Sequence, residues 1–417
     1  MLNIRVDRIG EHIKALKGEL RARLPDLKKV MAEVEDFTRR EVDEIAKARA
    51  AGRTVVPVLD FKHIEAGTVS EATKDELRRR GVAVVRGVYP KAQAEAWNDE
   101  LGEYLAKNRY TERRPAPKVK DEYFSKLKSD KPQIFGIYWS KPQMMARQHP
   151  NSARTRSFMN RLWKFETAGK RHFDPDRECN YADRIRRREP GDKTLGLSPH
   201  MDAGSVERWL DDEYRHVFRH VFSGNWKAYD PFDGASRAET DEIPSPAVCS
   251  MFRSFQGWTA LTPQGPGDGT LQVMPFTKGM IYLLLRPLMD DVPDDLLCGA
   301  QPARAFSVEK EWHAPLLPAL SAIPHVEPGD TVWWHPDIVH AVEDEHRGKG
   351  YSNVVYIAAA PLCAKNTAYL EKQKAAFLSG KSAPDFSAED YETDFAGRAT
   401  PADLSDLGRK QMGLVSW

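Results

Sequence analysis

Residues 198–209 read SPHMDAGSVERW and place His200 two positions before Asp202. Side chains two apart on an extended strand point to the same side, so this pair is able to bind one ion together. A His-x-Asp pair also occurs in ordinary polar turns, and Pro199 and Gly204 flank this one. The choice between a turn and a metal site depends on whether the chain offers a further ligand.

A second segment, PGDTVWWHPDIVH at residues 328–340, offers that ligand. Its opening Pro-Gly-Asp predicts a turn, residues 331–334 predict a strand, and His340 follows after a proline. Two histidines and one carboxylate occupy one face of an octahedral ion and leave the opposite face open, as in non-haem Fe(II) oxygenases. His340 reaches the earlier pair only if distant strands lie face to face, which favours a barrel or jelly roll.

Short apolar segments separated by turn residues extend this pattern. Strands are predicted in GVAVVRGVY (81–89), PQIFGIYWS (132–140), CSMFRSFQGWTALT (249–262), GTLQVMPF (269–276), GMIYLLLRP (279–287), PGDTVWWH (328–335) and YSNVVYIAAAP (351–361). Several short strands at this spacing are typical of jelly rolls. The predicted fold is mainly β with flanking helices, around a double-stranded β-helix (jelly roll, cupin-like) core.

Helical periodicity marks both ends of the chain and one insert. Residues 1–52 are a predicted N-terminal helical arm, whose apolar stripe comprises Ile9, Ile13, Leu16 and Leu20. The jelly-roll domain is predicted to span residues 53–363, with a helical insert at about 205–245. Residues 364–417 are predicted to form a C-terminal helix and tail that pack on the same domain.

Composition excludes several classes of protein. The 417 residues contain 62 Lys and Arg against 61 Asp and Glu, a balance that argues against a nucleic-acid partner. The longest apolar stretch, MIYLLLRPLM, is too short to span a bilayer, and the N-terminus has no signal-peptide pattern. We therefore expect a cytoplasmic protein with no membrane partner. No CxxC spacing occurs among the four cysteines Cys179, Cys249, Cys298 and Cys363.

The two histidine segments together resemble the Fe(II)/2-oxoglutarate-dependent dioxygenases, in particular the phytanoyl-CoA hydroxylase-like branch. Three further segments share the resemblance: GVAVVRGVYPKAQAEAWNDEL (81–101), RIRRREPGDKTLGLSPHMDAG (184–204) and GWTALTPQGPGDGTLQVMPFTKG (257–279). Nearly the whole chain is similar to the YbiU-like domain family, which implies no particular substrate.

This resemblance implies a catalytic Fe(II) held by His200, Asp202 and His340. It also implies 2-oxoglutarate as cosubstrate, dioxygen as oxidant, and succinate and carbon dioxide as products. His335 is the rival for the third ligand position. It lies five residues before His340 and would face the other way on a regular strand, while His346 is interpreted as a loop residue.

The cosubstrate anchor departs from the family pattern. Related enzymes carry an Arg or Lys at the start of the last strand, where a guanidinium binds a carboxylate through two hydrogen bonds. Here that place holds Tyr351 and Ser352. The cation must come from elsewhere, with Arg286 and Lys349 as minor candidates. The residues predicted to bind the cosubstrate are Arg253, Trp258, Arg347 and Ser352.

Basic clusters upstream of the metal motif suggest the nature of the substrate. Arg113 and Arg114 form one cluster, and Arg184 to Arg188 form another. Strand alternation puts Arg184, Arg186 and Arg188 on one face, where they could recognise an anion, although such clusters also occur on solvated surfaces. The sequence predicts a hydroxylase-type oxygenase acting on a small polar, anionic molecule. The alternatives are a metal-dependent hydrolase or isomerase on the same triad, and a non-catalytic cupin-like binding protein.

Overall fold

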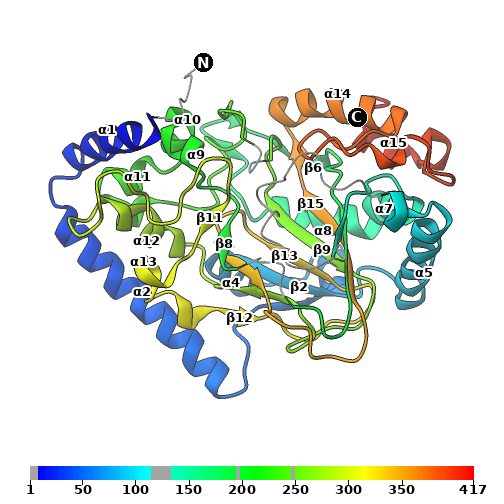
Figure 1. Ribbon diagram of the computed structural model, residues 1–417, viewed down its shortest axis with the longest axis horizontal. Coiled ribbons are helices and arrows are strands. Elements are labelled where there is room, and N and C mark those ends of the chain that lie inside the picture. Colours follow the sequence, from blue (N-terminus) through cyan, green and yellow to red (C-terminus); the bar gives the residue numbers. More distant parts are fainter. Residues whose placement is uncertain (1–7, 114–132, 194–197, 246–248) are drawn as a thin grey trace.

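Two β-sheets lie at the centre of the molecule and helices surround them (Figure 1). This architecture is seen in a computed structural model, which describes residues 8–113, 133–193, 198–245 and 249–417. Helices hold 41% of the described residues and strands 17%. The protein is therefore mixed α/β and not mainly β as predicted, because the segments that connect its short strands are themselves largely helical.

The larger sheet has seven strands and is antiparallel except for the parallel pair β1–β2. In spatial order its strands are β1 (Val58–Asp60), β2 (Val82–Arg86), β13 (Thr331–Trp334), β9 (Phe255–Ala260), β15 (Ser352–Ala359), β7 (Ile185–Arg188) and β3 (Ile134–Phe135). Strands from all parts of the chain are thus neighbours, and segments distant in sequence reach one site.

The smaller sheet has five strands and is antiparallel throughout. Its order is β11 (Phe306–Ser307), β8 (His200–Met201), β14 (His340–Val342), β10 (Leu271–Val273) and β12 (Ser321–Ala322). Two further two-stranded sheets pair β6 (Asp174–Glu178) with β16 (Pro361–Leu362), and β4 (Glu166–Thr167) with β5 (Lys170–Arg171). Within the described ranges, the two larger sheets do not close into a barrel.

The helices form a layer outside each sheet. Those of the first half of the chain are α1 (Ile9–Ala22), α2 (Leu27–Ala50), α3 (Phe61–Glu65), α4 (Glu71–Arg80), α5 (Lys91–Lys107), α6 (Tyr110–Arg113), α7 (Lys141–Gln148) and α8 (Pro150–Asn160). The remaining ones are α9 (Val206–Leu210), α10 (Asp212–Val217), α11 (Arg219–Phe222), α12 (Gly279–Leu285), α13 (Lys310–His313), α14 (Ala364–Ser379) and α15 (Asp406–Gln411).

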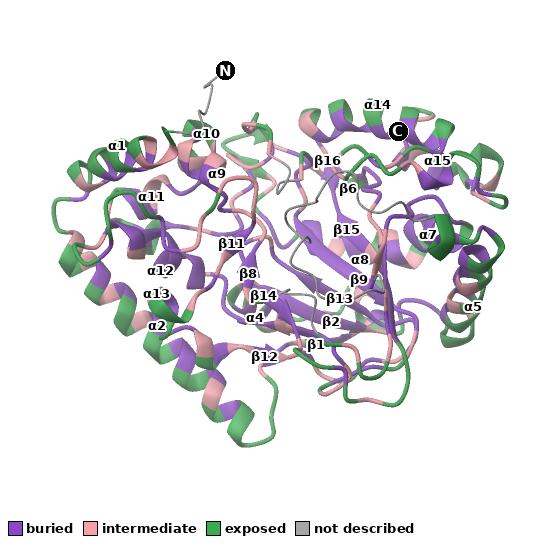
Figure 2. Cartoon of the chain, in the orientation of Figure 1, coloured by how far each residue is buried: buried purple, intermediate pink, exposed green. Residues whose placement is uncertain are grey.

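Three apolar clusters separate these layers. One packs the outer face of the larger sheet against α5, α7 and α8, and another packs α1, α2 and α9 to α12 behind the smaller sheet. The third lies between the sheets, where Val84, Trp258, Val332 and Val354 of the larger sheet contact Val273 of the smaller one. Figure 2 shows the central strands buried. Strands covered on both faces explain the continuous apolar runs in the sequence.

Local chemistry places the strand β2 at the end of α4. Ser70 caps the start of α4 by accepting a hydrogen bond from the Thr73 amide at 3.2 Å. Gly81 ends the helix with a φ of +64°, in the left-handed region that favours glycine. A Cβ atom at this position would lie 2.4 Å from Cγ2 of Thr277, so the turn into β2 excludes a larger side chain.

One predicted strand is wrong, and another begins later than predicted. The segment GMIYLLLRP forms helix α12, whose seven residues are all buried, and not a strand. A helix that is buried all round shows a continuous apolar run like that of a buried strand, so periodicity does not separate the two. Strand β9 begins at Phe255, so Arg253 precedes the strand and does not lie within it. No helix of the described chain has the length and apolar character needed to cross a membrane.

The N-terminal arm contributes to the common core, which a substitution in α1 tests. Leu20 is 1% exposed and packs in the cluster behind the smaller sheet. We expect Leu20→Ala to lower the free energy of unfolding by about 2–5 kcal/mol, through lost burial and the cavity left behind. Urea unfolding followed by circular dichroism measures this change.

Leu378→Ala in α14 is the matched control, because Leu378 is 51% exposed and also helical. Its effect should stay within about 0.5 kcal/mol. Equal destabilisation by the two substitutions would contradict the packing of the arm described here.

Candidate metal centre

His200 and His340 face each other across two neighbouring strands. They are directly paired residues of β8 and β14, and their ring centroids are 4.3 Å apart. Directly opposite residues of an antiparallel pair project to the same face of the sheet. His340 is also paired with Val273, which lies in the cluster between the two sheets. Both imidazoles therefore point into the inter-sheet space.

Each imidazole is held by a backbone carbonyl two residues before it. Nδ1 of His200 lies 2.8 Å from the oxygen of Ser198, and Nδ1 of His340 lies 3.0 Å from that of Ile338. A hydrogen on Nδ1 that is donated to the carbonyl fixes the tautomer and leaves the Nε2 lone pair free. This is the second contact that metal-binding histidines characteristically make.

Asp202 completes the triad. It follows directly after β8, and its Oδ1 lies 3.5 Å from Nε2 of His200 and 3.6 Å from Nε2 of His340. Adjacent ligand atoms around an ion at about 2.1 Å would lie roughly 3 Å apart. The three side chains thus fit one face of a metal ion after a small contraction. They are the one group with suitable ligand atoms in the described part of the chain.

The protonation states suit metal ligands. Burial, and then the neighbouring His200, lower the pKa of His340 to about 4, so its imidazole is neutral near pH 7. Burial of Asp202 disfavours its carboxylate, but interactions with His340, His200 and Arg253 outweigh burial and hold the pKa below the usual value. A neutral imidazole and an ionised carboxylate are the forms that bind metal.

His335 does not reach the triad. Its ring stacks on Trp163 at 4.8 Å, and its Nε2 lies 2.9 Å from the carbonyl oxygen of Pro231. His346 lies in the connection between β14 and β15, where its Nδ1 accepts a hydrogen bond from the Gly348 amide at 3.1 Å. Both rings thus have structural contacts elsewhere.

A small cavity of about 100 Å³ adjoins Asp202. Arg253 lines it, with Nη2 3.9 Å from Oδ2 of Asp202 and its guanidinium over the ring of Tyr181. Gln256 and Tyr214 also line it, and neither Nε2 of Gln256 nor the Tyr214 hydroxyl has a hydrogen-bond partner among the described residues. The cavity therefore offers unused polar groups beside the candidate metal centre.

Arg253 is the most weakly paired arginine of this cavity, since its ion pair with Asp202 is long at 3.9 Å. Two other charged side chains of the lining are neutralised in the protein, since Arg237 binds both carboxylate oxygens of Asp337 and Glu242 pairs with Lys365. Arg253 makes no hydrogen bond with the described residues beyond its long contact to Asp202. A guanidinium in this state is suited to binding an anion.

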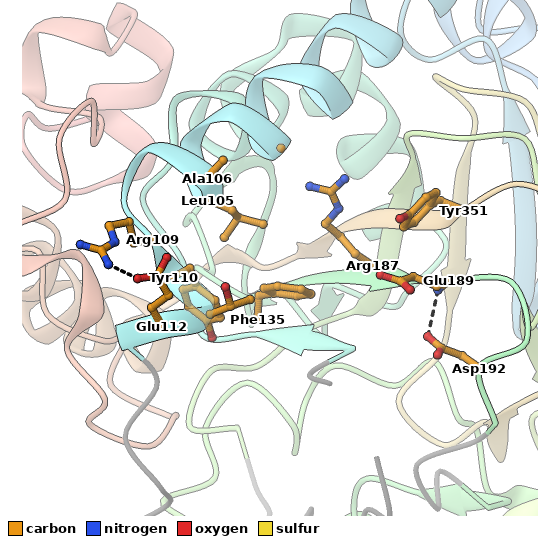
Figure 3. Close-up of a pocket in the computed structure, with 12 residues that line it drawn as sticks. Leu105, Ala106, Arg109, Tyr110, Glu112, Phe135, Arg187, Glu189, Asp192 and Tyr351 are labelled. Atoms are coloured by element: carbon orange, nitrogen blue, oxygen red, sulfur yellow. Dashed lines mark hydrogen bonds and ion pairs between the residues drawn. The ribbon is translucent and has the colours of Figure 1, made fainter. Parts of the chain in front are cut away.

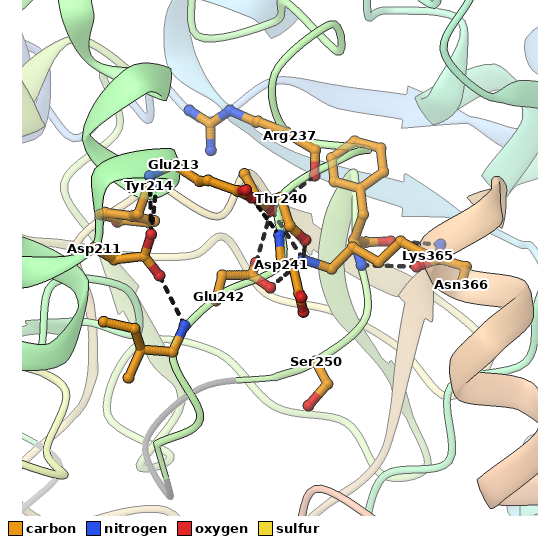
Figure 4. Close-up of polar contacts among 12 residues, drawn as sticks. Asp211, Glu213, Tyr214, Arg237, Thr240, Asp241, Glu242, Ser250, Lys365 and Asn366 are labelled. Atoms are coloured by element: carbon orange, nitrogen blue, oxygen red, sulfur yellow. Dashed lines mark hydrogen bonds and ion pairs between the residues drawn. The ribbon is translucent and has the colours of Figure 1, made fainter. Parts of the chain in front are cut away.

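Polar contacts fix the segment that covers the cavity (Figure 4). Asp211 accepts a hydrogen bond from the Ile243 amide at 2.8 Å, and Glu213 accepts one from the Asp241 amide at 2.6 Å. Lys365 of α14 donates to the carbonyl oxygen of Thr240 at 2.8 Å. The helical insert and the C-terminal helix therefore hold one wall of the site together.

The residues predicted to bind the cosubstrate are divided between two places. Trp258 lies in the inter-sheet cluster, and Ser352 is fully buried at the start of β15, on the same face of the larger sheet. Arg347 and Lys349 are exposed in the β14–β15 connection and do not line the cavity. Arg286 forms a two-bond ion pair with Asp291.

The arginines before the metal motif differ in their surroundings. Arg184 packs over the ring of Phe386, and Arg188 donates to three backbone carbonyls. Arg186 is buried between the sheets with a single weak hydrogen bond. Arg113 is exposed and pairs with Asp394, whereas Arg114 lies outside the described residues.

A larger cavity of about 440 Å³ lies away from the triad (Figure 3). It is lined from α5, α6 and the outer part of the larger sheet, with Leu105, Tyr110, Phe135, Arg187 and Tyr351 among its walls. None of the three candidate ligands lines it. Size alone therefore does not identify the functional site.

Several site residues escaped the sequence interpretation. Gln256 and Tyr214 belong to segments predicted as strand and helix, and nothing in their local pattern distinguishes them from other polar residues. The carbonyls of Ser198 and Ile338 carry no sequence signal. The shared offset of two residues before each histidine is the feature that could have indicated them.

The fold and the site together define a two-sheet α/β protein with a candidate 2-His-1-carboxylate metal centre between its sheets. The chain belongs to the Gig2-like family, whose model matches residues 7–414.

Relatives of known structure share this fold over nearly the whole chain. The protein YbiU of Escherichia coli K12 is 45% identical over 404 residues, which cover 96% of each chain. The "Putative Oxidoreductase" of Salmonella typhimurium LT2 is 44% identical, with a TM-score of 0.92 and 97% of each chain covered. GlcNAc Inducible Gene 2 of Candida albicans is 28% identical, with a TM-score of 0.81 over 96% of this chain and 89% of its own.

The metal centre makes a direct prediction. His200→Ala and Asp202→Ala should each weaken Fe(II) binding by more than about 100-fold, because even residues that only support metal ligands contribute 10–100-fold. Anaerobic calorimetric titration with Fe(II) measures the affinity, and circular dichroism checks that the fold is kept.

His325→Ala is the control, since His325 is half exposed and pairs with Glu327 at the surface. It should bind Fe(II) like the unaltered protein. Stoichiometric binding retained by Asp202→Ala would exclude the triad as the metal centre.

Proposed function

We propose that this protein is a non-haem Fe(II)- and 2-oxoglutarate-dependent oxygenase that hydroxylates a small polar, anionic molecule. The observation that carries the proposal is the arrangement of His200, Asp202 and His340, with both Nδ1 atoms tied to carbonyls and both Nε2 atoms near Oδ1 of Asp202. A facial triad with open positions is typical of non-haem Fe(II) oxygenases. The description of the Salmonella relative as a candidate oxidoreductase agrees with this class.

The residues fit an Fe(II) ion chemically. Two neutral imidazoles and one carboxylate are the donors that this ion takes in such enzymes, and three further positions would stay open. Iron(II) bound there supplies the reaction of dioxygen with 2-oxoglutarate, in which one oxygen atom enters the substrate and the other enters succinate with release of carbon dioxide. The chain itself orients the ligands through the Ser198 and Ile338 carbonyls and excludes water with the apolar inter-sheet cluster.

The same proposal extends to the fold. We interpret the facing seven-stranded and five-stranded sheets as the two halves of a double-stranded β-helix. In this interpretation, the metal ligands come from the smaller sheet and face the larger one, as the pairing of His200 with His340 supports. The jelly-roll core of residues 53–363 stays a proposal on these grounds.

The cavity beside Asp202 is the proposed substrate site. The weakly paired guanidinium of Arg253 favours a substrate with a carboxylate or phosphate group. Gln256 and Tyr214 add an amide donor and a hydroxyl for its polar groups. The sequence placed Arg253 on the cosubstrate, and its position in the cavity leads us to assign it to the substrate.

The cofactor assignment is tested by anaerobic addition of Fe(II) and 2-oxoglutarate. We expect a weak visible charge-transfer absorption band and, in air, succinate release that a substrate stimulates. A metal-dependent hydrolase or isomerase would show no band and would turn over without dioxygen. A non-catalytic binding protein would bind metal and release no succinate. Either of these results would exclude the oxygenase.

A second prediction concerns Arg253. A panel of small carboxylic and phosphorylated acids is first screened for stimulation of succinate release, and the most active compound serves as the probe. Arg253→Gln should raise the Michaelis constant for this compound by about 10–100-fold, because a charge-assisted hydrogen bond contributes about 1.5–3 kcal/mol.

The Michaelis constant for the cosubstrate, 2-oxoglutarate, should change less than about threefold in Arg253→Gln, because the proposed contact is to the substrate alone. Arg171→Gln is the control, since this side chain is 59% exposed and lines neither cavity, so it should affect neither constant. If Arg253→Gln raises the Michaelis constant for 2-oxoglutarate more than that for the probe, Arg253 binds the cosubstrate and not the substrate.

A further inference from the structure

Arg186 of β7 is a buried charge between the two sheets. Its neighbour Ile185 belongs to the cluster on the outer face of the larger sheet, so alternation turns Arg186 inward. It is paired with Val354 of β15, which lies in the inter-sheet cluster. The side chain is 3% exposed. Arg186 thus shares the space into which the metal ligands point.

This guanidinium has no counter-charge in the described part of the chain. Its one hydrogen bond runs from Nη2 to Oε1 of Gln264 at 3.4 Å, and its Nε has no partner there. Arg188, two residues later, donates instead to the carbonyls of Gly269, Glu343 and Asp192 at 2.8–3.0 Å. Burial of an unpaired charge is expensive, and burial lowers the pKa of Arg186 accordingly. The missing partner is an anion.

Other donors converge on the point that Arg186 reaches. Oε1 of Gln264 accepts a hydrogen bond from Oγ of Ser352 at 3.0 Å and lies 3.5 Å from Oγ1 of Thr270. All three of these side chains are fully buried. One amide oxygen therefore lies near a guanidinium and two hydroxyls. These three groups are hydrogen-bond donors of the kind that bind a carboxylate. A bound carboxylate would take the place of this oxygen.

The register places Arg186 away from the cavity mouth. Gln256 of β9 lines the cavity beside Asp202, and four residues along the same strand Ala260 is paired with Val354, the partner of Arg186. This separation is roughly 13 Å along the sheet at about 3.3 Å per residue. An arginine side chain and a short diacid together bridge such a distance, so a diacid bound at the candidate metal centre would reach toward Arg186.

Tyr356 links the two ends of this space. It lies on β15 two residues after Val354, on the same face of the sheet as Ser352. Burial raises the pKa of its hydroxyl, while the charge of Arg186 lowers it and that of Asp202 raises it. The register places Tyr356 midway, because its partner Trp258 lies between Gln256 and Ala260 on β9.

We propose that Arg186 and Ser352 bind 2-oxoglutarate through its distal carboxylate, with the guanidinium supplied by β7 instead of the last strand. The proposal rests on the proposed oxygenase function. It accounts for the departure of this sequence at Tyr351–Ser352, because β7 is the direct neighbour of β15. A cation on either strand faces the same inter-sheet space. The site selects a 2-oxo acid with a second carboxylate over one without it.

The test compares two 2-oxo acids in three proteins. The visible band of the Fe(II) protein is titrated anaerobically with 2-oxoglutarate and with 2-oxopentanoate, which has the same chain length and no second carboxylate. The unaltered protein should bind 2-oxoglutarate at least about 30-fold more tightly, the usual effect of a buried charge pair. Arg186→Gln should lose this preference by weakening 2-oxoglutarate binding alone, and Arg186→Lys should keep part of it.

Arg187→Gln is the matched control. Arg187 lies on the same strand, faces the outer side and lines the distant larger cavity. The Arg187→Gln protein should therefore prefer 2-oxoglutarate as strongly as the unaltered protein does. Thermal unfolding of the ligand-free proteins provides a second measurement. Arg186→Gln should be as stable as the unaltered protein or more so, since an unpaired buried charge is removed, whereas an arginine with a structural role would be destabilised on loss.

The outcomes separate the two proposals. If the unaltered protein shows no band with either acid, the oxygenase function is wrong and the Arg186 assignment is overturned with it. If the band forms and the preference persists in Arg186→Gln, only the assignment is overturned. If Arg253→Gln loses the preference and Arg186→Gln keeps it, the distal carboxylate binds Arg253. This result also overturns the Arg186 assignment.

Discussion

The pairing of His200 with His340 is the constraint on which the rest of the site depends. Both residues stand on short strands of the smaller sheet, and their side chains face the larger sheet only in the observed register. A shift of one residue would turn each ligand toward the helices behind the sheet, where Met201 now packs. The helices α1, α2 and α12 cover that rear face, so this apolar packing holds the histidines in their inward orientation.

The apolar space between the two sheets also determines what its charged side chains need. The cluster between the sheets consists largely of valine and tryptophan, a medium in which an isolated charge is costly. Arg186 is nevertheless buried there beside Gln264, and Asp202, whose side chain is 30% exposed, lines the small cavity at the candidate metal centre. Such charges are tolerated where a ligand or an ion balances them. In the proposed function, the metal ligands and the buried arginine are parts of one binding site.

The covering elements belong to the same unit as the sheets. The insert and the C-terminal helix α14 meet at Lys365, which contacts both Thr240 and Glu242 beside the cavity. The family match from residue 7 to residue 414 includes the arm, the insert and the tail. The Salmonella relative has the same arrangement over 97% of the chain. The elements beside the cavity are thus common to these proteins.

The sequence alone determined the three candidate ligands, the N-terminal helical arm, strands β2, β13 and β15, and the departure at Tyr351–Ser352. These features are local, since residue type, spacing and periodicity express them directly. The overall class, the helical state of α12 and the division of the arginines depended on tertiary structure. A buried helix and a buried strand can have the same continuous apolar sequence. Neighbouring arginines of one strand likewise show no sequence difference between those that are paired and those that are not. Both Arg186 and Arg188 are buried on β7, and only the folded chain distinguishes them, because it brings three backbone carbonyls within reach of Arg188.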